Sequence, residues 1–157
     1  MPKEIVTRDG SITFYSDLYR ETYHSQTGAW EEAIRKFGVI TDTGCVTEDI
    51  EEAIPHLDGA ALESNHDVEM LVKGPYPWYL KKRIMGQFGH LSNIVSAQLV
   101  ESKSSKSMKT IFLSHLSQNN NTPDLAMNTY RAILKDKAKD IQLNMTYREK
   151  ATGLIKI

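Results

Sequence analysis

Polar residues that can bind a metal ion or move a proton follow three short apolar segments of this chain. Asp42 comes after the first segment, the stretch 63–67 after the second, and Ser114-His115 after the third. The apolar segments are residues 39–41, 60–62 and 111–113. Ligands of an open α/β sheet gather beyond the carboxyl ends of its strands, so these side chains are expected on one rim. Acids, bases and metal ligands on one rim are typical of a hydrolytic site.

Nitrogen ligands are scarce around this predicted rim. The chain has five histidines, and none of them forms an H-x-H-x-D-H run or another dense cluster. A site with two metal ions usually needs more imidazole ligands than these. The sequence therefore predicts an incomplete dinuclear site.

Alternating strand and helix patterns predict an α/β fold with these residues at the strand ends. Residues 5–7 and 12–15 flank Asp9-Gly10, which is typical of a β-hairpin. Further strands are predicted at 39–41, 59–63, 111–113, 141–147 and 153–157. Capping residues and apolar spacing predict helices at 29–37, 48–54, 67–72, 80–85, 92–101 and 123–134, with loops at 17–28 and 103–109. In the helix over 80–85, we expect Lys81, Lys82 and Arg83 to face outward.

Composition limits the class of protein. A length of 157 residues with 40% apolar content is enough for one ordinary core. A net charge of -1 and a pI near 6.5 argue against a strongly basic nucleic-acid surface, although a local basic patch stays possible. Cys45 is the lone cysteine, and neither a signal segment nor a membrane-spanning apolar stretch is evident, so we expect a cytoplasmic protein without a membrane partner.

Six motifs occur in a fixed order along residues 38–157. They are T-D-T-G at 41–44, E-S-N-H-D at 63–67, M-L-x-x-G-x-Y-P at 70–77, L-K-x-R-I at 80–84, G-H-L-S-N at 89–93 and L-S-H-L-S-x-x-N-N at 113–121. Together they resemble the second half of a metallo-β-lactamase-fold hydrolase, in particular the YycJ-like branch, which is similar to exonucleases and related to ribonuclease Z. The resemblance implies half of an αββα sandwich, with one mixed sheet and helices on one face.

The resemblance also implies roles for individual residues. Asp42 matches the carboxylate that bridges two metal ions, and His115 matches a late histidine ligand. Glu63 and His90 match an acid and histidine that pass a proton to the leaving oxygen. His66 and Asp67, in the motif of the branch itself, are possible additional site residues. A divalent cation, zinc or manganese, and a nucleic acid substrate are implied.

Residues 1–37 stand where complete members carry their histidine-rich half. The strings D-G-S at 9–11, E-T-Y-H-S at 21–25 and G-A at 28–29 resemble the start of an MnmC-like tRNA-modification methyltransferase. The glycine-rich S-adenosylmethionine loop does not follow, so no cofactor site is expected there. We predict two segments, 1–37 and 38–157, each an incomplete part of a larger domain.

Each candidate residue also has a purely structural explanation. An Asp before Thr-Gly often only forms a turn, and a lone histidine often bonds to a backbone partner in a core. The ordered motifs favour the functional interpretation of Asp42, His90 and His115. D-T-G also marks aspartic proteases, but the helices predicted here argue against that fold.

A group of aromatic and basic residues near the middle of the chain keeps two interpretations. It consists of Tyr76, Trp78, Tyr79, Lys81, Lys82 and Arg83. These residues can stack bases and hold phosphate, or they can be a Pro-Trp turn packed on a helix.

Two hypotheses therefore follow. The first is a metal-dependent, nuclease-like phosphodiesterase whose site is incomplete in this chain. The second is a non-catalytic half-domain or fusion fragment that acts through self-association. In either case the second face of the sheet needs a cover, and we predict a homo-oligomer, a missing complementary half or residues 1–37.

Overall fold

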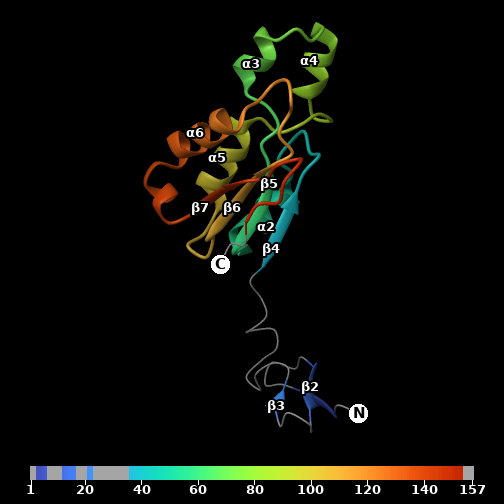
Figure 1. Cartoon of the computed structure of the whole chain (residues 1–157), viewed down its shortest axis with the longest axis vertical. Helices are drawn as coiled ribbons and strands as arrows, with labels where there is room; N and C mark the ends of the chain where they lie inside the picture. The colour runs from blue at the N-terminus through green and yellow to red at the C-terminus, as the bar shows by residue number, and fades with distance from the viewer. Residues whose placement is uncertain (1–2, 7–11, 17–20, 23–35, 154–157) are drawn as a thin grey trace. The chain divides into compact units, whose positions relative to one another are not determined.

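The computed structural model describes residues 3–6, 12–16, 21–22 and 36–153 of the chain (Figure 1). The chain divides into two compact units, Met1–Arg35 and Lys36–Ile157. Among the described residues, no helix has the length and apolar character needed to cross a bilayer.

The first unit contains a small antiparallel sheet. Strands β1 (Lys3–Val6) and β2 (Ile12–Ser16) pair with Val6 opposite Ile12, which confirms the predicted hairpin. A two-residue strand β3 (Glu21–Thr22) pairs with β2 inside the stretch predicted as a loop. Two residues are too few for a detectable alternation of polar and apolar side chains. The predicted turn at Asp9-Gly10 and most of the predicted helix 29–37 lie outside the described residues.

The second unit is built on a four-stranded sheet in which the strands follow one another in chain order. The strands are β4 (Phe37–Ile40), β5 (Gly59–Glu63), β6 (Thr110–Ser114) and β7 (Gln142–Met145). This arrangement confirms the α/β class and is consistent with half of an αββα sandwich. All three pairings are parallel, where the sequence predicts a mixed sheet, because every connection contains a helix that returns the chain to the same edge.

The helices of this unit begin within two residues of their predicted starts, and Thr47 caps α2 as predicted. They are α2 (Glu48–Ala53), α3 (Val68–Lys73), α4 (Trp78–Ile84), α5 (Asn93–Lys103) and α6 (Pro123–Leu134). Four have side-chain N-caps that accept a backbone N–H three residues later, namely Thr47, Asp67, Ser92 and Thr122. Short 3-10 helices follow α2 and α6, at Ile54–His56 and Lys135–Lys139. Figure 1 shows α3 and α4 beyond the edge of the sheet where the strands end.

Two predictions need correction, and a third concerns residues that the structure does not describe. Phe37 and Gly38 belong to β4 and do not end a helix, because they pair with Gly59 and Ala60. Lys81 is buried and does not face outward, because its ammonium group donates to the carbonyl oxygens of Val72 and Gly74, both at 2.7 Å. The final strand predicted at 153–157 lies outside the described residues apart from Gly153.

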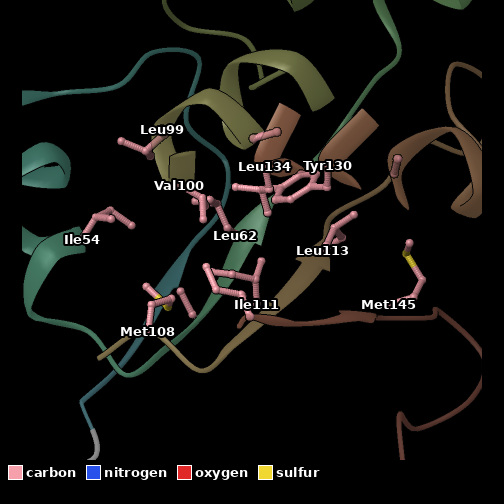
Figure 2. Packing of buried hydrophobic residues seen from close by; sticks show 14 residues of the cluster. Ile54, Leu62, Leu99, Val100, Met108, Ile111, Leu113, Tyr130, Leu134 and Met145 are labelled. Atoms are coloured by element: carbon pink, nitrogen blue, oxygen red, sulfur yellow. The ribbon is translucent and has the colours of Figure 1, made fainter. Parts of the chain in front are cut away.

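The hydrophobic core lies between one face of the sheet and the helices α5 and α6 (Figure 2). Ala60 and Leu62 of β5 and Ile111 and Leu113 of β6 face this side and are fully buried. Parallel strands covered by helices bury their alternate residues here, and this burial is the main source of stability. The core therefore holds β5 and β6, whose ends carry the candidate site.

The opposite face of the sheet is open in the described residues. Register places Val39 beside Ala61 and Phe112, and Phe37 in the same row as Gly59. Val39 is 71% exposed and Phe37 is 46% exposed. This outer face, defined by Phe37, Val39, Ala61 and Phe112, is the surface for which the sequence predicts a cover; which cover it has stays a prediction.

Tyr130 connects α6 to the core through a buried hydroxyl. Its Oη lies 3.3 Å from the Ser64 hydroxyl, which donates to it, and 2.6 Å from the Ser96 hydroxyl. Burial raises the pKa of the Tyr130 phenol to about 12. The side chain is therefore neutral at physiological pH and ties α5, α6 and the end of β5 together.

We predict that Tyr130→Phe lowers the free energy of unfolding by about 1–2 kcal/mol, because the two serine hydroxyls lose their buried partner. Urea unfolding followed by circular dichroism measures this change. Tyr147→Phe, at an exposed tyrosine, is the matched control and should change stability by less than about 0.5 kcal/mol. Equal effects of the two substitutions would contradict the structural role of the Tyr130 hydroxyl.

Candidate metal centre

The candidate site lies where three strands of the parallel sheet end. Asp42 comes two residues after β4, Glu63 is the last residue of β5, and His115 directly follows β6. His90 comes from the segment between α4 and α5. The structure brings the side chains of these four sequence-predicted residues together.

The carboxylate of Glu63 holds both imidazoles. Its Oε1 lies 2.8 Å from Nδ1 of His90 and 2.8 Å from Nδ1 of His115. Its Oε2 accepts the backbone N–H of Thr43 at 2.9 Å, and the whole side chain is buried. An ionised carboxylate only accepts hydrogen bonds, so both rings donate through Nδ1 and turn Nε2 away from it.

Asp42 faces the two rings from the side of β4. Its Oδ1 lies 3.6 Å from Nε2 of His115 and 3.9 Å from Nδ1 of His90. One ligand atom from each of these three residues lies within 4.8 Å of the others. One carboxylate and two imidazoles are a donor set that suits zinc and also serves manganese. The residues present therefore fit one divalent cation.

Backbone strain accompanies this arrangement. Asp42 and His115 both have a φ of 57°, in the left-handed region that non-glycine residues rarely adopt. Such residues persist only where the surroundings fix them, and they gather at functional sites. This conformation turns the backbone sharply after β4 and after β6, which places the side chains of Asp42 and His115 at the cluster.

Two glycines let the loop after β4 approach the loop that carries His90. A Cβ on Gly44 would overlap backbone atoms of Gln87 and Gly89, and a Cβ on Gly89 would overlap the carbonyl oxygens of Arg83 and Ile84. The backbone N–H of His90 donates to the Ile84 carbonyl at 2.9 Å. The position of His90 is thus set by backbone packing as well as by Glu63.

The two possible additional residues lie outside the ligand cluster. Asp67 accepts the backbone N–H of Met70 at 2.8 Å and caps α3. His66 is 2% exposed, and its Nδ1 has no hydrogen-bond partner among the described residues. Burial, followed by the nearby His90, lowers the pKa of His66 to about 4. His66 is therefore neutral at pH 7.

Sequence reasoning missed the contact between Glu63 and His115. It paired Glu63 with His90 alone, whereas the structure gives both rings the same distance to this carboxylate. It also missed the hydrogen bond from the Thr43 N–H to the Glu63 carboxylate. The available signal was the parallel order of the strands, because neighbouring strand ends place Glu63 beside Ser114 and hence beside His115.

The fold and cluster together define the class of this protein: an α/β layer, consistent with half of an αββα sandwich, with carboxylate and imidazole groups at its strand ends. The chain is 40% identical over 135 residues, which are 82% of this chain and 51% of the relative, to a Bacillus anthracis protein named exodeoxyribonuclease YycJ. It is 41% identical over 92 residues, 59% of this chain and 34% of the relative, to proteins of two Streptococcus pneumoniae strains named exodeoxyribonuclease WalJ. These proteins are its homologues.

The chain spans about half the length of the first of these relatives and about a third of the others. No family model matches the chain. The homology supports the YycJ-like resemblance of the sequence. It does not support the methyltransferase-like resemblance of residues 1–37, which stays a prediction.

His66 makes a pH dependence of stability testable. Its pKa of about 4 lies below the ordinary value of 6.5, so the unfolded chain takes up a proton first as the pH falls. Stability should therefore decrease below pH 6.5 and down to about pH 4. We predict that His66→Gln removes on the order of 2 kcal/mol of this acid-induced loss.

Urea unfolding of both proteins between pH 7.5 and 4.5 measures this difference. His56→Gln, at an exposed histidine, should leave the pH dependence unchanged. A His66→Gln protein as acid-sensitive as the parent would contradict the lowered pKa.

Proposed function

We propose that this chain carries part of the site of a metal-dependent, nuclease-like phosphodiesterase of the metallo-β-lactamase superfamily. The observation that carries the proposal is the buried Glu63 carboxylate, 2.8 Å from Nδ1 of both imidazoles, with Nε2 of His115 3.6 Å from the Asp42 carboxylate. The names of the homologues, exodeoxyribonucleases, support a nucleic acid substrate.

In this proposal Asp42 and His115 hold a divalent cation. Such a cation, when bound, acidifies a water molecule and stabilises negative charge on a phosphodiester. His90 donates a proton to the leaving oxygen, and Glu63 orients its ring and stabilises the protonated form. We leave His66 and Asp67 out of the ligand set, because His66 lies outside the cluster and Asp67 caps α3.

The number of metal-ligand atoms limits what this site can bind. The described residues bring together three ligand atoms, enough for one loosely held cation and short of the shell that two cations need. If His90 serves as the acid, only two donors remain for the cation. The proposed site is thus incomplete, and another chain or segment would have to supply further ligands for full activity.

We therefore predict very slow cleavage of single-stranded DNA by this chain alone, with little response to added Mn²⁺ or Zn²⁺. Metal analysis after dialysis should find less than one tightly held ion per chain. Asp42→Ala should change the free energy of unfolding little, because no tightly bound metal is lost. His115→Ala should lower it by about 1–3 kcal/mol, because the buried Glu63 carboxylate loses one of its hydrogen-bond donors. Gel assays of a labelled oligonucleotide and urea unfolding measure these outcomes.

Asp49→Ala and His56→Ala, at exposed positions of α2 and the following 3-10 helix, are the matched controls. Fast metal-dependent cleavage that Asp42→Ala or His115→Ala abolishes, while the controls do not, would contradict an incomplete site. Two tightly held ions per chain would contradict it as well.

The outer face of the sheet favours a second candidate function, that of a non-catalytic half-domain acting through self-association. Val39, on the edge strand β4, is 71% exposed and lies in one row with Ala61 and the partly exposed Phe112. A second copy of the chain laid on this face would bury these apolar side chains.

We predict a dimer in light scattering coupled to size exclusion, and its loss on Val39→Lys. Burial of a lysine ammonium group without a partner opposes association of this face. Val72→Lys, at an exposed valine of α3, is the control and should remain dimeric. A parent chain that stays monomeric at high concentration would contradict self-association through the outer face.

A further inference from the structure

A pocket of about 470 Å³ opens directly beside the metal-ligand cluster. His90 and His115 form one wall of it, so a bound molecule would touch both imidazoles. Its volume lies in the roughly 300–1,000 Å³ range of small-ligand sites. Its other lining residues come mainly from the turn before α4, from α4 and the loop that follows it, and from the loop after His115.

Two arginines line this pocket, although the chain as a whole has a net charge of -1. Arg83 and Arg148 line it, and its lining includes no Asp or Glu. Neither guanidinium forms an ion pair with a carboxylate among the described residues. Arg148 instead reaches the carbonyl oxygen of Leu116, next to His115, at 3.5 Å. Two unpaired guanidinium groups at one pocket suit an anion with several oxygens, such as a phosphate.

The same pocket is lined by an exposed aromatic side chain that is not part of the hydrophobic core. Phe88 is 93% exposed, two residues before His90. Its loop is held in place, because the N–H of Gly89 donates to Gly86 at 2.8 Å and the Gly44 loop packs against it. A phenyl ring offers only apolar and stacking contacts, and a planar base is the matching surface.

A hydrogen bond connects two of the segments that line the pocket. The amide of Asn119 donates to the Tyr76 hydroxyl at 2.8 Å, which connects the loop after β6 to the turn before α4. A preformed wall lowers the ordering cost of binding. The aromatic and basic group noted in the sequence thus divides: Tyr76 and Arg83 line the pocket, while Lys81 is buried and bonds to backbone carbonyls.

We propose that this pocket seats one nucleotide of a single-stranded nucleic acid, with its base stacked on Phe88 and its phosphates bound by Arg83 and Arg148. The proposal rests on the proposed function, since it supplies the substrate contacts next to the ligand cluster. Any base can stack on a phenyl ring. This nucleotide-binding pocket, the seat, therefore confers a preference for unpaired strands and little preference for sequence.

Fluorescence anisotropy of a labelled thymidine octanucleotide, titrated with the full chain in EDTA, tests this seat without metal or cleavage. Phe88→Ala should weaken binding about tenfold, and Phe88→Trp should preserve it. Arg83→Gln and Arg148→Gln should each weaken binding and reduce the slope of log affinity against log salt by about 0.7. A duplex of the same sequence should bind less tightly than the single strand.

Leu125→Ala and Arg131→Gln, both at exposed positions of α6, are the controls, with folding checked by circular dichroism. No binding by the parent chain, or binding that Phe88→Ala and the arginine variants leave unchanged, would overturn the seat. The proposed function is judged separately by metal binding and cleavage in the Asp42→Ala and His115→Ala proteins. Loss of binding in the Phe88 and arginine variants alone supports the seat whatever that second result.

Discussion

The buried carboxylate of Glu63 is the interaction on which the candidate site depends. It lies at the end of β5, away from water, and is within 2.8–2.9 Å of two imidazole Nδ1 atoms and one backbone N–H. A buried carboxylate is tolerated only when hydrogen-bond donors surround it, so Glu63 and its donors require one another. This mutual requirement fixes the orientation of both rings and the path of the chain after Asp42.

The strand end that carries Glu63 is itself held by a buried polar network. The amide of Asn121 donates to the backbone carbonyls of Ser64 and Asn65, at 2.8 and 3.1 Å, and exchanges hydrogen bonds with the amide of Asn93. Tyr130 bonds the hydroxyl of Ser64 from the other side. Ser64 and Asn65 of the E-S-N-H-D motif therefore support the strand end, and Glu63 is the residue of this motif that hydrogen-bonds the two imidazoles.

Local patterns in the sequence predicted most of the second unit. The bounds of β5 and α6 agree with the prediction because turn residues, a capping threonine and Pro123 mark them. Long-range contacts were out of reach: nothing in the spacing of Lys81 indicates that two carbonyl groups bury it, and nothing near Phe88 indicates a pocket. The cluster of Asp42, Glu63, His90 and His115 could be predicted as a set, whereas the sharing of Glu63 by both rings depends on the distance between strands.

The candidate site and the open sheet face lie on the same side of the sheet. Alternation along β5 puts Leu62 in the core and Ala61 and Glu63 on the opposite side, so the site and the outer face lie on the same side of the sheet. Glu63 can be buried there only because the loops of Thr43, His90 and His115 fold over the strand end, whereas Val39 has no such cover among the described residues. A molecule that covered Val39 and Phe112 would lie on the side of the sheet that carries Asp42, where the proposed function calls for further ligands. In the proposed function, a cover for this face and the further ligands would therefore come from the same side of the sheet.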